Sequence, residues 1–154
     1  MKIIGSFQID RPLHTDQNIY LDMFYRYRRI ARDEARLNGR IRPIKLARAN
    51  LPYGLEGEFY ISQNSEYALF DARGNLRHPY THPNSWCPFR FANNRMDMIW
   101  SGMSTTSIPE WAEFYVEKFF LPWGYTLNGS VDVIDTRKQI RVTAKANHII
   151  AKDI

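Results

Sequence analysis

The sequence predicts an α+β fold in which an antiparallel sheet carries two helices packed on one face, ferredoxin-like with extra strands. Segments with alternating apolar residues and segments with helical spacing predict this fold, because they follow the order strand, helix, strand, hairpin, helix, hairpin. A length of 154 residues with 44% apolar content suits one hydrophobic core. We therefore expect residues 1–154 to form a single domain.

The first half of the chain is expected to provide a strand, a long helix and a second strand. Residues 2–9 alternate as a strand does. Thr15 or Asp16 can then cap a long helix that ends at Asn38-Gly39. A basic connector follows, and residues 55–62 predict a half-exposed strand that pairs with the first. The apolar stripe of the helix consists of Tyr20, Met23, Phe24, Tyr27, Ile30 and Ala31.

The second half is expected to provide a loop, two hairpins and a helix between them. Residues 63–85 contain several turn residues and predict a long loop, the natural place for a variable function. Residues 86–92 and 96–100 predict a hairpin. A capping box that begins at Ser107 predicts a second helix, which Pro122 and Gly124 end. Residues 125–134 and 139–147 predict the final hairpin.

Basic residues are concentrated between Arg26 and Arg48, where nine of them stand against Asp33 and Glu34. This segment carries a charge of +7, whereas the whole chain carries +5, so the positive charge is local. The apolar stripe of the predicted helix would leave its arginines facing solvent, where they would attract an acidic partner. The predicted binding residues are Arg26, Arg28, Arg29, Arg32, Arg36, Arg40, Arg42 and Lys45.

Three interpretations of this basic segment stay open. It can be a solvated helix face, which is the usual explanation for a run of charges. It can dock on an acidic protein. It can also neutralise the phosphates of a nucleic acid whose bases stack on Tyr25, Tyr27 or Tyr53.

The sequence signals for a catalytic or metal site are weaker than the signal of the basic segment. His78, His82 and Cys87 would need a distant ligand such as Asp71 or His14 to hold zinc, so loop histidines and a buried thiol are the expected interpretation. A small enzyme that uses this loop is a third hypothesis. Glu56 and Glu58 would share one strand face and could bind a cation, but exposed strand residues fit better. No glycine-rich phosphate loop occurs. We therefore expect no metal, no cofactor and no enzymatic activity.

The compartment follows from three further features. The N-terminal residues lack an apolar run of signal-peptide length, and no window approaches the roughly 18 apolar residues of a membrane span. Cys87 is the single cysteine, so no intrachain disulfide can form. We expect a soluble cytoplasmic protein without a membrane partner, and exposed sheet edges would allow a homodimer.

Short motifs in the C-terminal part resemble those of a known family. They are Gly54 to Tyr60 (GLEGEFY), Pro83 with Trp86-Cys87, Ile99 to Gly102 (IWSG), Glu110-Trp111 with Phe119, and Pro122 to Gly129 (PWGYTLNG). The chain thus resembles, over about residues 54–133, a family of small uncharacterised proteins encoded mainly by bacteriophages and prophages. Two departures are that the family usually has a more acidic stretch at residues 89–98, and that the basic segment is heavier here.

The resemblance implies a phage or prophage accessory protein, and it implies no reaction. We therefore expect a non-enzymatic protein that acts in the host cytoplasm. Through its basic helix it would bind and block a host protein or protein–nucleic acid complex, such as a defence or nucleic-acid-processing complex. The alternative is direct binding of nucleic acid or of a signalling nucleotide. We expect the motif residues to be structural, with Trp86, Trp100, Trp111 and Trp123 as core anchors and Gly124 and Gly129 in turns.

Overall fold

The computed structural model describes residues 2–40, 51–100 and 107–154 and divides into two compact units. Unit 1 comprises Met1–Leu13 and Pro88–Ile154, and unit 2 comprises His14–Cys87. The sheet belongs to unit 1, whereas the described part of the basic segment, residues 26–40, belongs to unit 2. The predicted connector over residues 101–106 and most of the basic connector, residues 41–50, lie outside the described residues.

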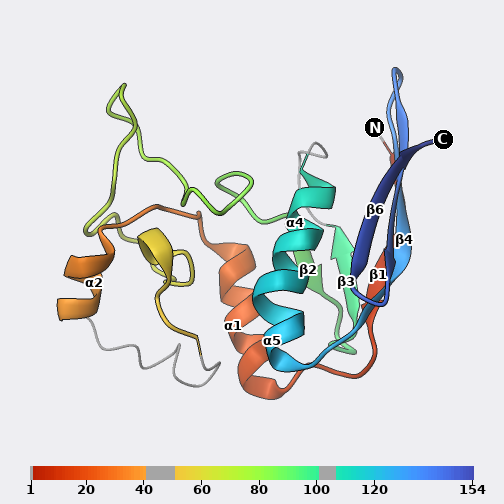
Figure 1. Cartoon of the computed structure of the whole chain (residues 1–154), viewed down its shortest axis with the longest axis horizontal. Helices are drawn as coiled ribbons and strands as arrows, with labels where there is room; N and C mark the ends of the chain where they lie inside the picture. Colours follow the sequence, from red (N-terminus) through yellow and green to blue (C-terminus); the bar gives the residue numbers. More distant parts are fainter. Residues whose placement is uncertain (1, 41–50, 101–106) are drawn as a thin grey trace. The chain divides into compact units, whose positions relative to one another are not determined.

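Unit 1 is built on a six-stranded sheet in which every neighbouring pair is antiparallel (Figure 1). The spatial order is β2-β3-β1-β4-β5-β6, so the first four strands follow the ferredoxin-like order and two strands are added at one edge. The predicted α+β class with an antiparallel sheet is confirmed. The strands are β1 (Lys2–Ile9), β2 (Phe89–Phe91), β3 (Asp97–Trp100), β4 (Leu127–Ile134), β5 (Gln139–Lys145) and β6 (His148–Asp153).

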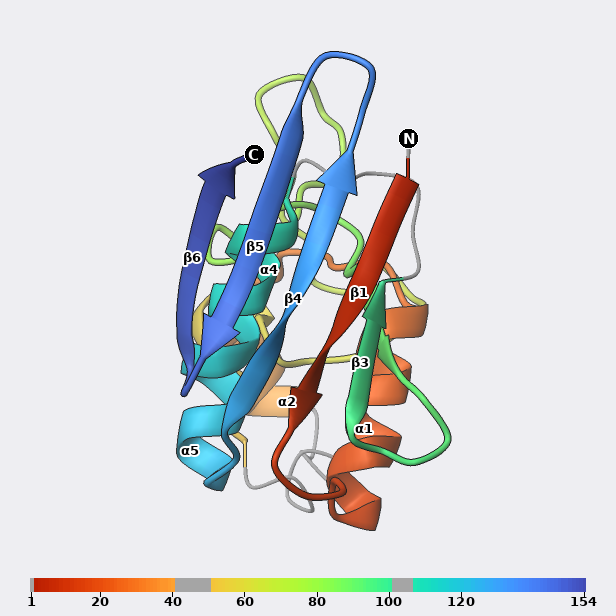
Figure 2. The same ribbon diagram turned by 90° about the vertical axis from the view of Figure 1, so that its right-hand side faces the viewer.

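A continuous helical segment of unit 1 covers one face of this sheet, and in Figure 2 it lies behind the strands. It begins as α4 (Ile108–Tyr115), widens into the π-helical η2 (Val116–Phe120) and ends as α5 (Leu121–Trp123). The predicted helix is confirmed, although Ser107 makes no capping hydrogen bond through its side chain. Gly124 ends it in the left-handed conformation, with φ of 82°.

Aromatic rings fill the space between this helix and the sheet. Tyr115 packs edge-on against Phe89, and Phe120 packs edge-on against Phe91 and Tyr125. Phe7 of β1 meets Phe89 in the same way, at a ring distance of 5.9 Å. Because side chains alternate across a strand, the residues between these core positions point to the opposite side of the sheet, which we call the open face.

The β1 and β4 backbones approach each other closely at a pair of glycines. Gly5 lies opposite Val131, and Gly129 lies opposite Phe7. A Cβ atom on Gly129 would stand 2.5 Å from the Ser6 carbonyl oxygen, and its φ of 123° lies where side chains are strained. The sequence predicts a turn at Gly129, but the structure places this residue within β4, where only glycine allows this approach.

The last strand, β6, is missed by the sequence analysis. It pairs with β5 through a two-residue turn in which Ala146 and Asn147 both have positive φ, 48° and 69°. The Asn147 side chain accepts a hydrogen bond from the Leu127 backbone N–H at 2.7 Å and donates one to the Tyr125 carbonyl at 3.1 Å. The turn is thereby tied to the start of β4.

Unit 2 contains two short helices where the sequence predicts one long helix. They are α1 (Thr15–Arg26) and α2 (Glu34–Arg40), and residues 27–33 between them are not helical. We call residues 27–33 the strap. The predicted helix end at Asn38-Gly39 is also wrong, since both residues lie inside α2. The side chain that caps α1 is His14, whose Nδ1 accepts from the Asp16 N–H, rather than Thr15 or Asp16.

The strap is extended because its backbone bonds to distant segments instead of to itself. The N–H groups of Arg29, Ala31 and Arg32 donate to the carbonyls of Ser85, Arg77 and Glu56 at 2.7 to 2.8 Å. The Ala31 carbonyl accepts from the Leu69 N–H at 2.8 Å. These tertiary bonds satisfy the groups that a helix would have paired locally, so the helical pattern of the sequence is overridden.

The strand predicted over residues 55–62 does not form. The segment instead contains the short 3₁₀ turn η1 (Leu55–Gly57), in which Gly54, Glu56 and Gly57 have positive φ values of 76°, 55° and 66°. A strand requires strongly negative φ at each residue, so these angles exclude it. The predicted pairing with the first strand is therefore also wrong.

No helix in the three described stretches is both long and apolar enough to cross a membrane.

Candidate functional site

Arg32, a predicted surface contact, is fully buried in unit 2. Its guanidinium donates to the carbonyl oxygens of Ile30, Ser62, Asn64 and Glu66, at 2.5 to 3.5 Å, and stacks over the Tyr60 ring at 4.8 Å. Burial lowers the pKa of Arg32 below its ordinary value. The role predicted for Arg32 is wrong, because a side chain committed to these internal carbonyls cannot contact a partner.

Arg29 is buried in the same way, with 1% of its surface exposed. It donates to the carbonyls of Tyr27 and Tyr60 at 3.3 and 3.4 Å, and its guanidinium lies 4.3 Å from the centre of the Phe24 ring. Tyr20 lies nearby and donates to the Phe59 carbonyl at 2.6 Å, and burial raises its pKa far above the usual range. Arg29 is thus also a core residue and not a surface contact.

The other predicted contact residues differ in their exposure and in the groups that they bind. Arg26 forms an exposed ion pair with Asp22 at 2.8 Å, and Arg36 forms one with Asp33 at 3.9 Å. Arg28 is half-buried and donates to the Leu76 carbonyl at 3.4 Å. Arg40 ends α2, and its side chain is not among those described. Arg42 and Lys45 lie outside the described residues.

Glu56 and Glu58 anchor the predicted loop instead of facing solvent from a strand. Glu56 forms a bidentate ion pair with Arg77, and its Oε1 accepts from the Tyr80 N–H at 2.9 Å. The hydrogen bond from Arg77 holds the pKa of Glu56 below its usual value. Glu58 is 3% exposed and accepts from the Thr81 hydroxyl at 2.5 Å. The interpretation of both carboxylates as exposed strand residues is wrong.

The loop histidines and the cysteine are placed separately. His82 is buried with its ring edge-on to Phe24 at 5.6 Å, and Cys87 is buried, as the sequence predicts for the thiol. The His78 ring nitrogen Nδ1 lies 2.8 Å from the Pro79 carbonyl. Over the described residues, no group of three or more His, Cys, Asp or Glu side chains is arranged to hold a metal ion.

Three aromatic side chains between residues 70 and 86 point into solvent. Tyr80 is 82% exposed, Phe70 58% and Trp86 57%. Trp86 was expected in the core, so that prediction is wrong, whereas Trp111 is fully buried and is the core anchor expected. We call Phe70, Tyr80 and Trp86 the aromatic tips. Tyr53, a predicted stacking surface, is 3% exposed and packs edge-on against Tyr60.

The backbone that carries the aromatic tips is fixed at several points. Phe70 opens a small turn, closed by a bridge to Leu76, in which Asp71 accepts from the N–H groups of Arg73 and Asn75. The Tyr80 N–H donates to the Glu56 carboxylate, and the Ser85 carbonyl, next to Trp86, accepts from the backbone N–H of Arg29. The exposed rings are therefore held on a defined backbone and not on a loose loop.

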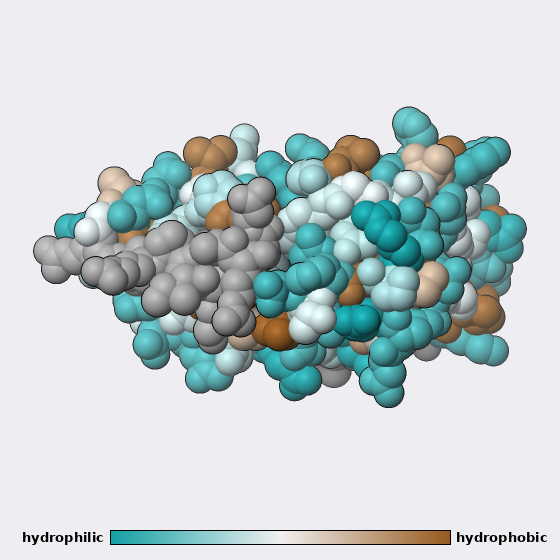
Figure 3. Space-filling model, turned by 90° about the horizontal axis from the view of Figure 1, so that it is seen from below, coloured by the Kyte–Doolittle hydropathy of each residue, from teal (hydrophilic) through white to brown (hydrophobic). Residues whose placement is uncertain are grey.

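The molecular face seen in Figure 3 shows hydrophobic residues as separate spots among hydrophilic ones, not as one continuous patch. Isolated exposed apolar side chains are ordinary on a soluble surface, and the aromatic tips stand out by their size and their fixed backbone. Comparisons of the chain with family models, with curated proteins and with solved structures give no match.

Proposed function

We propose that this protein is a non-enzymatic accessory protein of a bacteriophage or prophage that binds and blocks a protein of the host, through the aromatic tips of unit 2. The observation that carries the proposal is the exposure of Tyr80, Phe70 and Trp86 on a backbone fixed by the Glu56–Arg77 ion pair and by main-chain hydrogen bonds to the strap. The phage context rests on the resemblance of the GLEGEFY and PWGYTLNG motifs.

Tyrosine and tryptophan are the side chains most enriched at the energetic centres of protein interfaces. They bring a large apolar area with few rotatable bonds, so they lose little conformational entropy when a partner covers them. A preorganised backbone lowers the cost of association further. Buried Arg29 and Arg32 hold the strap against residues 60–66. The backbone N–H groups of the strap in turn bind the Arg77 and Ser85 carbonyls of the segment that carries the aromatic tips.

The exposed arginines have a secondary role in this proposal. Arg26 and Arg36 lie on the helices α1 and α2, where their ion pairs are solvent-exposed and weak. Such rim charges change the rate of association with an acidic partner more than the lifetime of the complex. Arg26→Gln with Arg36→Gln should therefore slow association and reduce its salt dependence, with a nearly unchanged dissociation rate.

The test is affinity capture from a lysate of the host, with and without nuclease, using wild-type protein and three variants. Tyr80→Ala and Trp86→Ala should each weaken the binding of the captured protein by about 30-fold, which corresponds to about 2 kcal/mol at an interface anchor. Leu121→Ala is the matched control, because Leu121 is 59% exposed, close to the 57% of Trp86, and belongs to unit 1. It should bind like the wild type.

The proposal fails if capture by the Tyr80→Ala and Trp86→Ala variants equals that of the wild type. It also fails if nuclease removes all binding, since the partner would then be nucleic acid and not protein. Far-ultraviolet circular dichroism of each variant establishes that folding is retained, which is expected because both rings point into solvent.

A further inference from the structure

We propose that the open face of the unit 1 sheet binds the phosphate backbone of double-stranded nucleic acid. This site is separate from the aromatic tips of unit 2 and does not depend on the function proposed for them. Three observations carry it: the sign of the exposed charges, the polar character of the side chains between them, and the type of side chain that the face lacks.

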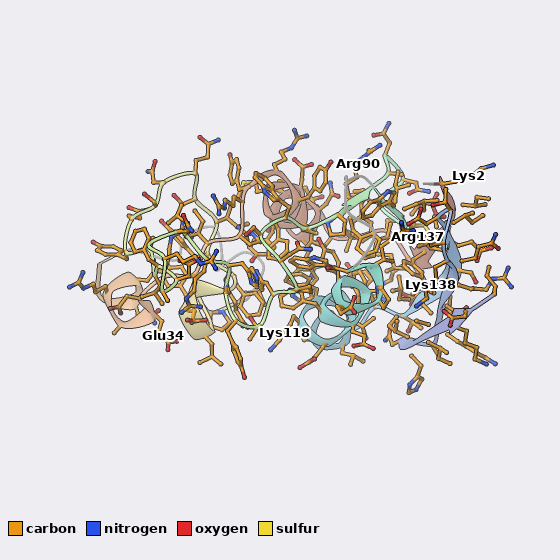
Figure 4. The ribbon with its side chains drawn as sticks, turned by 90° about the horizontal axis from the view of Figure 1, so that it is seen from above. Lys2, Glu34, Arg90, Lys118, Arg137 and Lys138 are labelled. Carbon is orange, nitrogen blue, oxygen red and sulfur yellow. The ribbon has the colours of Figure 1, made fainter. Side chains whose placement is uncertain are left out.

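The exposed charges of the open face are all positive. Five basic side chains point to this side from the strands, namely Lys2, Arg90, Arg141, Lys145 and Lys152, and all are exposed. Figure 4 labels Lys2 and Arg90 on their strands, with Arg137 and Lys138 on the neighbouring turn between β4 and β5. Phosphate groups are the natural complement of such a surface.

The two acidic residues of the open face are half-buried and engaged. Asp132 accepts two hydrogen bonds from Arg141, at 2.7 and 3.0 Å, and this contact lowers its pKa. Asp97 accepts from the side chains of Gln8 and Asn94, at 2.8 and 2.9 Å. The charges of Arg141 and Asp132 cancel. Most of the positive field therefore comes from the other four cations, Lys2, Arg90, Lys145 and Lys152.

The helix side of unit 1 carries the opposite sign. Glu110, Glu113 and Glu117 are exposed along α4 and η2, and Lys118 is the basic residue beside them. The charges of unit 1 are therefore separated between the two sides of its sheet. A polyanion is attracted to the open face and repelled by the helix side.

Between the cations the open face presents hydrogen-bonding side chains as well as isoleucines, of which Ile4 and Ile150 are 46% and 48% exposed. Ser130 lies opposite both Ser6 and Thr143, and its hydroxyl is 3.5 Å from that of Thr143. Gln8 and Asn128 form the next pair along the same two strands. Hydroxyl and amide side chains, together with lysine and arginine, make most protein contacts to phosphates and sugars. Neighbouring strands lie about 4.8 Å apart, so the five spacings of the six-stranded sheet span about 24 Å, which suits several phosphates along a duplex.

The side chains of the open face favour a double-stranded partner over a single-stranded one. Proteins that hold single strands stack the bases on aromatic rings. Every strand residue of the sheet is described, and those on the open face include no phenylalanine, tyrosine or tryptophan; the one ring there is the exposed imidazole of His148, opposite Lys145. Since the face offers cations, hydroxyls and amides without a platform of large aromatic rings, it suits a partner whose bases are already paired and whose phosphates point outward.

The test measures binding of the full chain to a 20-base-pair DNA duplex of arbitrary sequence across a range of salt concentrations. The logarithm of the binding constant should fall with the logarithm of the salt concentration, by about 0.9 for each phosphate neutralised. Lys145→Gln with Lys152→Gln should therefore make this slope shallower by about 1.8. Lys118→Gln, on the helix side, is the matched control and should leave the slope unchanged.

Three outcomes would overturn the proposal. One is the absence of duplex binding at low salt. Another is an unchanged slope for Lys145→Gln with Lys152→Gln. Loss of binding in Arg26→Gln with Arg36→Gln would have the same meaning, because it would assign the nucleic-acid contact to unit 2. The third is tighter binding of one separated strand than of the duplex. None of these results bears on whether Tyr80 and Trp86 bind a host protein, so the two proposals fail independently.

Discussion

Arginines of the basic segment have opposite environments. Arg26 and Arg36 face solvent, whereas Arg29 and Arg32 are buried. Charge alone suggests that both arginines face solvent, but the guanidinium also fits a ring of backbone carbonyls, because its five donors spread in one plane. In this protein the carbonyls of residues 60–66 converge on the strap and supply those acceptors. A sequence does not reveal which carbonyls will converge, so this use of arginine could not be predicted.

Replacing Arg32 tests its structural role. Arg32→Met leaves four carbonyl oxygens without their donor and should lower the free energy of unfolding by about 3 kcal/mol. Arg32→Lys should also destabilise, since an ammonium cannot reach the same acceptors in one plane. Arg36→Met is the control, because its side chain is 71% exposed. Thermal unfolding followed by circular dichroism measures all three, and equal midpoints would contradict the role assigned to Arg32.

Glu56 makes the stability of unit 2 depend on pH at the acidic end. Its pKa is lower in the folded protein than its reference value of 4.5, chiefly because of the hydrogen bond from Arg77. Its stabilising contribution is therefore complete above that reference pKa and is lost as the pH falls through the lower folded value. Glu56→Gln should flatten the decline of stability below about pH 4.5, as chemical denaturation at several pH values would measure. An identical acid profile in the variant would contradict this.

At the scale of the element, the sequence predicts unit 1 better than unit 2. Strands β1, β4 and β5 were found because their apolar residues alternate and one face is buried, so local pattern and tertiary environment agree. The helix from Ile108 was found because Pro109 and a wide apolar stripe mark its start and its buried side. Strand β6 was missed because most of its residues are exposed and show no alternation of burial.

The candidate site lies where such local signals fail. The strap has helical spacing in its sequence, and residues 55–62 alternate like a strand, but both are shaped by hydrogen bonds to distant segments. The exposure of Tyr80 and Trp86 depends on the same contacts. The glycines of GLEGEFY were a usable signal, because a turn with three positive φ angles needs glycine at most of them.

The contact between β1 and β4 can be tested at Gly129. Gly129→Ala places a methyl group against the Ser6 carbonyl oxygen and the Phe7 Cα, at 2.5 and 3.0 Å, and should cost about 3 kcal/mol of stability. Gly74→Ala is the matched control, since its φ of 81° is also positive but nothing lies within 4 Å. It should cost about 1 kcal/mol. Similar unfolding midpoints for both variants would show that the close approach is not rigid.

At the scale of the whole molecule, the reactivity of the single cysteine reports on local and global unfolding. Cys87 is 3% exposed at the end of unit 2, and no other thiol exists in the chain. Reaction with a thiol reagent should therefore be slow in the native protein and fast in denaturant, because it requires local or global unfolding. Arg32→Met should raise the native labelling rate exponentially with the stability lost, by on the order of 100-fold for a loss of about 3 kcal/mol. Rapid labelling of the unmodified native protein would contradict the burial of Cys87.

The long reach of the Arg32 contacts also bears on how the chain acquires its structure. Its acceptors Ser62, Asn64 and Glu66 lie 30 to 34 positions further along, so a large loop must close before the guanidinium leaves water. The meander of β4, β5 and β6 joins neighbours through short turns and needs no such search. We expect the meander to assemble in the rate-limiting transition state and the arginine contacts to form after it. Arg32→Met should then accelerate unfolding while leaving the refolding rate nearly unchanged.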